Sequence, residues 1–195
     1  MLRINKVFCL FSLFVIGFFI ICFWVFDDII YVKKLDKKID NYFKISYNVS
    51  SFNSKDDNLD TYSGVLEIPS INLLKGFYDL SSRFNSVSNG LETLSGSVFP
   101  GEDYSLVMFA SHSGNSKVSY FNNLTSVKTG DKVNLYYKGN KYVYTITKCD
   151  ISRKNGFIRV RSSDFKNVIV LTTCLDGESL KQYTCYGVIS WICLL

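Results

Sequence analysis

The first strong pattern along the chain is an uncharged apolar run from Val7 to Phe26, in which Ser12 is the only clearly polar side chain. At a helical rise of about 1.5 Å per residue, this run measures about 30 Å, the hydrocarbon thickness of a bilayer. A cleavable signal peptide is the competing interpretation, but its apolar region is usually shorter and closes with small residues. Phe23, Trp24 and Phe26 stand there instead. The pattern therefore favours an uncleaved transmembrane anchor.

The pattern changes after this run. From Asp27 to about Phe43, apolar residues recur near helical spacing among lysines and aspartates, which predicts an amphipathic stalk helix. A helix lying on a membrane surface is less favoured, because the polar face is as acidic as it is basic. Residues 48–61 are rich in Ser, Asn and Asp and predict a flexible linker. We therefore divide this part into an N-terminal segment (1–6), an anchor (7–26) and a stalk with linker (27–63).

Short apolar runs separated by turn residues begin near Gly64. Val65–Pro69 and Ile71–Leu74 predict two short strands, split by a proline that lacks a hydrogen-bond donor. Further on, the alternating segments Thr129–Tyr137 and Tyr142–Thr147 flank a Gly-Asn turn and predict a β-hairpin.

Between these strands, Asn115–Leu124 predicts a loop and a short helix, with Phe121 and Leu124 packing inward. Short strands at regular spacing, with one or two short helices, predict a mainly β fold that closes into a barrel. This domain should occupy residues 64–195.

Two apolar strands end in reactive side chains. Asn167–Cys174 is rich in β-branched residues, which suits a buried strand, and turn residues follow it. Ser105–His112 is a second apolar strand that runs into a polar loop. A thiol reacts as its thiolate and needs a partner, and His112 is the only histidine in the chain. The sequence therefore predicts a catalytic pair of Cys174 and His112.

Composition narrows the remaining options. At 195 residues the chain suits one domain with an extension, and its net charge of +5 is unremarkable. One histidine and no Cys-x-x-Cys argue against a metal site, and no glycine-rich phosphate loop or strong basic run points to nucleotides or nucleic acid. Cys9 and Cys22 lie in the anchor, whereas Cys149 and Cys193 should be inert core residues. A disulfide framework is not expected.

The chain resembles the sortases, membrane-anchored cysteine transpeptidases of Gram-positive cell surfaces. Val170–Cys174 is similar to the family's Thr-Leu-x-Thr-Cys strand at three of four specified positions, and Gly64–Pro69 keeps its Gly-x-Leu-x-Ile-Pro opening. The Phe-x-x-Leu segment at Phe121–Leu124 and the Gly-Asp-Lys-Val segment at Gly130–Val133 follow in the same order. The resemblance covers about Gly64 to Ser190 and implies a sortase-like β-barrel.

The resemblance also implies the site residues. Cys174 and His112 match the catalytic pair, with Ser111 where the family usually has glycine, and Thr173 is expected to bind substrate. Sortases place an arginine on the strand after the cysteine, but this chain has no arginine after Cys174. The alignment puts Gln182 at that position.

Other residues stay open as candidates for the arginine position. Lys181 is the adjacent alternative to Gln182, and Cys185 is a less favoured one. Arg159 and Arg161 precede the cysteine strand and can compensate only if their loop lies over the site.

The implied activity is cleavage of a C-terminal Leu-Pro-x-Thr-Gly-like sorting signal on secreted proteins, through a thioester, with transfer to an amine of a cell-wall precursor or a protein lysine. No cofactor is expected. The alternative is a degenerate, non-catalytic, membrane-anchored binding domain. A papain-type hydrolase is disfavoured because its cysteine precedes its histidine, and an L,D-transpeptidase is disfavoured because this chain lacks the His-Gly pair that precedes its cysteine.

The resemblance further implies a single-pass protein of the cell membrane with an extracytoplasmic catalytic domain and a cytoplasmic N-terminus. Lysines after the apolar run, counted alone, favour the opposite orientation.

Overall fold

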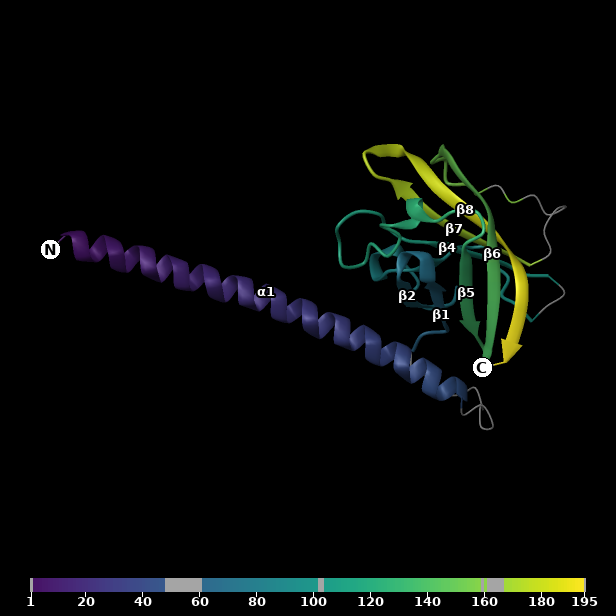
Figure 1. Cartoon of the computed structure of the whole chain (residues 1–195), viewed down its shortest axis with the longest axis horizontal. Coiled ribbons are helices and arrows are strands. Elements are labelled where there is room, and N and C mark those ends of the chain that lie inside the picture. The colour runs from purple at the N-terminus through teal and green to yellow at the C-terminus, as the bar shows by residue number, and fades with distance from the viewer. Residues whose placement is uncertain (1, 48–60, 102–103, 159, 161–166, 195) are drawn as a thin grey trace. The chain divides into compact units, whose positions relative to one another are not determined.

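The computed structural model describes residues 2–47, 61–101, 104–158, 160 and 167–194 (Figure 1). The chain divides into two compact units, Met1–Lys38 and Ile39–Leu195, and each is described by itself. The first unit is helical, and the second is built mainly of β-strands.

The N-terminal helix, α1 (Leu2–Tyr47), is continuous. Its segment Leu10–Lys44 contains an apolar stretch with a mean hydropathy of 2.4, and the segment is long and apolar enough to cross a membrane by length and composition. Apolar side chains of the predicted anchor, such as Phe14 and Phe23, are exposed. The predicted stalk helix is not a separate element, because no glycine or proline follows Gly17 within α1 to interrupt it. The predicted linker, apart from Thr61, lies outside the described residues.

Eight strands of the second unit form one sheet with the order β2-β1-β5-β6-β8-β7-β4-β3 (Figure 1). An isolated bridge joins Phe77, at the end of β2, to Leu91, just before β3, so the two edge strands approach each other. The sheet therefore curls into a nearly closed barrel, which confirms the predicted mainly β fold. The strands are β1 (Gly64–Ile68), β2 (Leu73–Phe77), β3 (Glu92–Thr93), β4 (Leu106–Ala110), β5 (Lys132–Tyr137), β6 (Asn140–Arg153), β7 (Val168–Leu175) and β8 (Glu178–Leu194).

The connections between strands include three short 3-10 turns: η2 (Pro69–Ile71), η3 (Val87–Asn89) and η4 (Leu124–Ser126). The proline between the first two strands begins η2, where its missing N–H is not needed by the sheet. The second strand consequently starts at Leu73 rather than at the predicted Ile71.

The predicted hairpin is confirmed in β5 and β6, but its turn differs. Tyr137 pairs with Asn140, so the connecting residues are Lys138 and Gly139 rather than a Gly-Asn pair. Both have positive φ, 46° and 74°, which is the backbone of a two-residue type I′ turn. Strand β6 also continues to Arg153, beyond the predicted end at Thr147, and there it pairs with β8.

The main core fills the inside of the barrel. Phe121 and Leu124 are fully buried in it, as predicted. Along β7, Ile169 and Leu171 belong to this core, whereas Val170 packs in a smaller cluster on the other face of the sheet. The alternation shows that β7 is buried on both faces, which explains its near-continuous apolar sequence.

One expectation about the cysteines is wrong. Cys149 on β6 and Cys185 on β8 are directly opposite each other and form a disulfide. Cys149 is therefore not an isolated core thiol, and Cys185 does not occupy the arginine position. Cys22, Cys174 and Cys193 are free among the residues that the structure describes.

Candidate active site

Cys174 lies near the end of β7, and its Cα is directly opposite that of Gln182 on β8. Side chains alternate along a strand, so Cys174 shares its face with Val170 and Thr172, on the side of the sheet away from the main core. Its thiol is free and half-buried. Because Gln182 is the cross-strand partner, its side chain emerges on the same face as the thiol.

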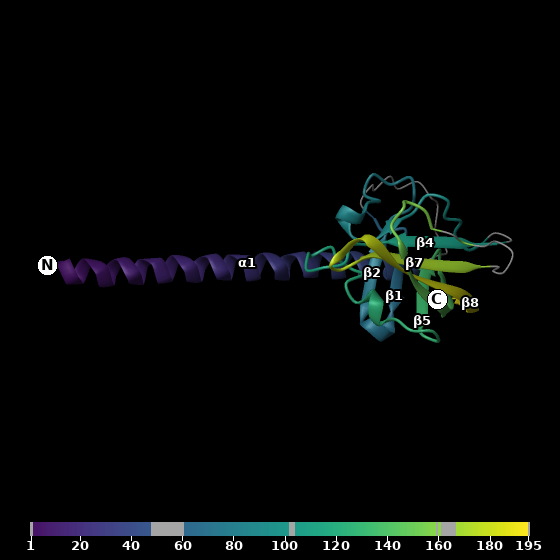
Figure 2. The ribbon, with the colours of Figure 1, turned by 90° about the horizontal axis from the view of Figure 1, so that it is seen from above.

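His112 reaches the same edge from the neighbouring strand. Strands β4 and β7 run side by side (Figure 2). They are parallel, with Ala110 opposite Thr172. The two segments stay together beyond β4, because the Ser111 N–H donates to the Thr172 carbonyl oxygen at 3.3 Å. His112 and Cys174 each follow the pair Ala110 and Thr172 by two residues, at the same edge of the sheet. The histidine side chain is exposed.

Hydrogen bonds fix the loop that carries the histidine. The buried Thr173 hydroxyl donates to the Ser111 carbonyl oxygen at 2.9 Å. The Ser111 hydroxyl accepts from the Tyr120 N–H at 3.2 Å, and the His112 carbonyl oxygen accepts from the Phe121 N–H at 3.2 Å. Ser111 thus contributes a hydroxyl contact that the usual glycine lacks. The Thr173 hydroxyl thus already has a partner within the protein. The substrate-binding role of Thr173 stays a prediction.

The candidates for the arginine position differ in orientation. Gln182 is half-buried and lies on the face of Cys174, whereas Lys181, its neighbour on β8, lies on the opposite face. The Lys181 ammonium forms an ion pair with Glu178 at 2.5 Å. The functional roles of Gln182 and Lys181 stay predictions. Arg159 and Arg161 lie outside the described residues.

A cation that the sequence reasoning missed contacts the thiol. The Lys154 ammonium nitrogen lies 3.2 Å from the Cys174 sulfur. Lys154 follows the last residue of β6, and its N–H donates to the Leu180 carbonyl oxygen at 2.8 Å. The sequence carries no local signal for this contact, because β8 lies between β6 and β7 in the sheet.

The sheet face that carries the thiol is polar on the side of β6 and apolar on the side of β4. Behind Cys174, the hydroxyls of Thr172 and Thr184 are 3.0 Å apart and hydrogen-bonded. Asp150 on β6 lies next to Thr184 in the register. On the β4 side, Met108 packs with Val170 in the smaller apolar cluster. A bound chain would therefore meet polar groups on one side and apolar groups on the other.

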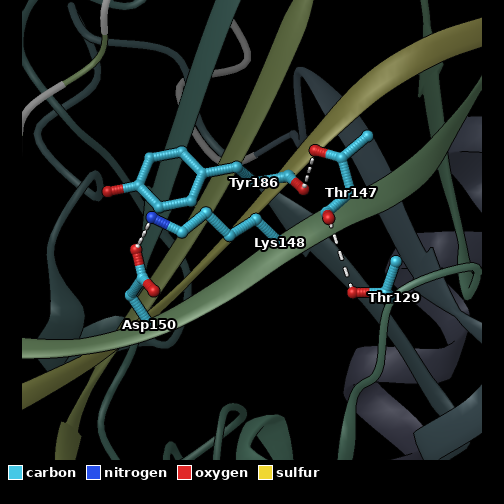
Figure 3. Close-up of polar contacts among 5 residues, drawn as sticks. All are labelled: Thr129, Thr147, Lys148, Asp150 and Tyr186. Atoms are coloured by element: carbon cyan, nitrogen blue, oxygen red, sulfur yellow. Dashed lines mark hydrogen bonds and ion pairs between the residues drawn. The ribbon is translucent and has the colours of Figure 1, made fainter.

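Figure 3 shows the polar side of this face. Lys148 and Asp150 form an ion pair beside the ring of Tyr186. Burial, followed by the charge of Asp150, raises the pKa of Tyr186, although Lys148 opposes the increase. Its hydroxyl is therefore neutral at physiological pH. The Thr147 hydroxyl donates to the Tyr186 carbonyl oxygen at 3.2 Å, and the Thr129 hydroxyl donates to the Thr147 carbonyl oxygen at 3.4 Å.

The arrangement brings a thiol, an imidazole and an ammonium to one edge of the barrel. These groups supply a nucleophile, a proton donor and a positive charge, which suits covalent acyl transfer. Within the described part of the chain, no cluster of His, Cys, Asp or Glu is grouped closely enough to hold a metal ion.

Comparison with solved structures shows the same fold in several sortases. Sortase C-3 from Streptococcus pneumoniae has a TM-score of 0.61 and 21% sequence identity, covering 71% of this chain and 67% of that chain. Sortase A from Listeria monocytogenes has a TM-score of 0.58 and 22% identity, covering 70% and 92%. Sortase E1 from Streptomyces coelicolor, solved with a tripeptide in the active site, has a TM-score of 0.56 and 15% identity, covering 67% and 89%.

Sequence comparison gives the family. None of the curated proteins matches this chain. Residues 66–188, which include His112, Cys174 and Gln182, match the sortase domain. This match spans well over half of the chain, so the protein belongs to the sortase family.

Proposed function

We propose that this protein is a cysteine transpeptidase that cleaves a C-terminal Leu-Pro-x-Thr-Gly-like sorting signal and transfers the cleaved protein to an amine. The observation that carries the proposal is the parallel register of β4 and β7, whose last pair, Ala110 and Thr172, lies two residues before both His112 and Cys174. Membership of the sortase family supports the class of reaction.

In the first half of the reaction, the Cys174 thiolate attacks the carbonyl carbon of the Thr-Gly bond. A carbon–sulfur bond forms, and the carbon–nitrogen bond breaks as His112 donates a proton to the leaving amine. The product is a thioester between Cys174 and the threonine carbonyl. The sorting signal beyond the bond leaves with a new N-terminal amine.

In the second half, an amine of a cell-wall precursor or of another protein attacks the thioester. His112 accepts the amine proton, the carbon–sulfur bond breaks, and the thiolate is restored. One amide has been exchanged for another, so the reaction needs no oxidant, reductant or nucleotide.

The rest of the chain suits an enzyme that acts at a membrane surface. The apolar segment of α1 suits an anchor, and tethering raises the local concentration of enzyme and of substrates emerging at the same surface. The Cys149–Cys185 disulfide supports an extracytoplasmic barrel, because disulfides persist in oxidising compartments.

A second candidate is a non-catalytic domain that binds sorting peptides without cleaving them. Gln182 is the specific observation in its favour, since an uncharged amide stands across from Cys174 where sortases carry arginine. Both candidates predict peptide binding, but only the transpeptidase predicts a thioester.

The proposal is tested with the full chain in detergent, a fluorogenic Leu-Pro-x-Thr-Gly peptide and a glycine-based amine. We expect release of the peptide's C-terminal fragment and a mass increase on Cys174 equal to the acyl group. Cys174→Ala should reduce turnover to background, and His112→Gln should reduce it by about 10²–10⁴.

The matched control is Cys193→Ala, which removes another free, half-buried cysteine and should leave turnover unchanged. Peptide binding that persists in Cys174→Ala, with no acyl adduct on the wild-type protein, would support the binding domain over the enzyme.

A further inference from the structure

We propose that Lys154 supplies the positive charge of this active site, in place of the arginine that sortases carry on the strand after the cysteine. The catalytic role of Lys154 rests on the proposed function, whereas its contact with Cys174 is independent of that function. The Lys154 ammonium is a hydrogen-bond donor 3.2 Å from the Cys174 sulfur. A thiolate accepts such a bond more strongly than a neutral thiol does.

The backbone explains how Lys154, just after β6, reaches a thiol on β7. Strand β8 lies between them, with Ser152 of β6 and Cys174 of β7 both opposite Gln182. Side chains alternate, so Lys154, two residues after Ser152, points to the same face as Cys174. The bond from the Lys154 N–H to the Leu180 carbonyl oxygen holds its main chain at the end of the ladder. The long lysine side chain then crosses the face of β8.

Other nearby charges are placed differently. Arg153 lies opposite Lys181 in the register, so both point to the other face of the sheet. Lys181 is also paired with Glu178. Lys154 is therefore the cation that the described structure directs at the sulfur.

The remaining titratable groups around the thiol define its electrostatic setting. They are His112 beside the end of β7, Asp176 in the turn after it, Glu178 at the start of β8, and Asp150 on β6. Glu178 and Asp150 already have lysine partners, Lys181 and Lys148.

The position of the Lys154 ammonium also suits the negative charge that develops on the substrate oxygen during acyl transfer. When Cys174 attacks a carbonyl carbon, the new oxyanion is two bonds from the sulfur. A donor in contact with the sulfur is therefore within reach of that oxygen after a small rotation of the lysine side chain. Lys154 would thus first hold the thiolate and then donate to the oxyanion, the two tasks in which a fixed cation lowers the barrier.

The first test measures alkylation of Cys174 by iodoacetamide in the full chain in detergent, quantified by mass spectrometry of the peptide that contains it. The reagent is uncharged, so its approach is not steered by the lysine. At pH 6.5, Lys154→Met should alkylate about threefold to tenfold more slowly than the wild type, because less thiolate is held. At pH 9.5, above the reference pKa of a cysteine thiol, the rates should agree within about twofold.

Two controls separate charge from structure. Lys154→Arg should keep the wild-type rates within about twofold at both pH values, because it keeps the charge. Arg153→Met loses the same charge one residue away, on the opposite face, and should also behave as the wild type. The free Cys193 serves as an internal reference in every sample.

The second test measures peptide turnover, where Lys154→Met should lower kcat/KM by roughly tenfold to a hundredfold and Lys154→Arg should restore it. If the wild type shows no turnover but Lys154→Met still slows alkylation at pH 6.5 alone, the charge contact stands and the proposed function fails. If turnover is present and Lys154→Met matches the wild type in both assays, the role of Lys154 is refuted while the proposed function stands. A rate loss of equal size at both pH values would also refute it, since that result indicates blocked access.

Discussion

At the residue scale, the unusual feature is that the group across from the proposed nucleophile carries no charge. Gln182 is the cross-strand partner of Cys174, so its amide can donate a hydrogen bond toward a substrate bound on that face. Compared with a guanidinium, an amide lacks the charge-assisted, two-pronged hydrogen bonding that suits an oxyanion and a peptide backbone. Gln182 thus brings no charge from β8, whereas Lys154 brings a cation to the sulfur from the end of β6.

Replacing the glutamine tests this division of roles. Gln182→Arg should raise kcat/KM for a Leu-Pro-x-Thr-Gly peptide, by up to the roughly 10²–10³ that one oxyanion donor supplies. The gain should be larger in the Lys154→Met background, where no lysine competes for the same oxygen. Lys181→Arg is the control and should have little effect, because Lys181 lies on the other face.

A different result would reassign the cation. If Gln182→Arg lowers turnover in both backgrounds and Lys181→Ala abolishes it, the substrate binds on the face that we have assigned to structure.

The reactive residues were predictable to different degrees. Cys174 and His112 each end an apolar strand, so a local pattern indicates them, and the single histidine leaves no other imidazole. Lys154 follows β6 in a stretch of ordinary polar residues. Its importance depends on which strand lies between β6 and β7, and that order is a nonlocal property that no local pattern contains.

At the element scale, the paired strands β6 and β8 position two of the residues around Cys174. Lys154 directly follows β6, β8 carries Gln182, and the two strands pair from Asn140 and Leu194 to Arg153 and Lys181. The sequence predicted the β5–β6 hairpin because a hairpin is local, yet it missed the last part of β6. That part, residues 148–153, is mostly polar and comes after a register shift between Ile146 and Lys148, where the regular pairing with β8 is interrupted.

The same reasoning explains the missed disulfide. Cys149 and Cys185 are 36 residues apart in sequence, and β7 comes between their strands along the chain. They face each other only because of the β6–β8 register, so their spacing in the sequence gives no indication of the bond.

We expect the disulfide to stabilise the barrel. Reduction, or the double substitution Cys149→Ala with Cys185→Ala, should lower the free energy of unfolding by about 2–4 kcal/mol, because the unfolded chain regains the freedom of the closed loop. Guanidinium titration followed by the fluorescence of Trp191, on β8, measures the change in the full chain in detergent.

Cys193→Ala is the control for this experiment and should show the wild-type response to reductant. Equal stability of the oxidised and reduced wild-type protein would mean that the bond contributes nothing beyond the surrounding packing.

At the scale of the whole molecule, the chain combines an apolar helix with a barrel that has its own core. All residues of the main buried cluster lie between Leu66 and Cys185. Both kinds of segment were evident from the sequence, because a long uncharged apolar run and a series of short strands are each strong local patterns. The uninterrupted extent of α1 was not predicted, since the change from apolar to charged residues at Asp27 resembles the start of a new element.

The last prediction concerns the independence of the barrel. A chain that begins at Ser63 should be soluble without detergent and should unfold cooperatively, because the exposed apolar surface of the anchor is removed while the main core is complete. Size-exclusion chromatography and thermal unfolding measure the two properties, and peptide turnover should persist because His112, Lys154 and Cys174 all remain. A chain that begins at Asp27 is the matched comparison, since it lacks the anchor but keeps the predicted stalk. If only this longer chain is soluble and cooperative, residues 27–62 are part of the folded domain, and the boundary that we set at Gly64 is wrong.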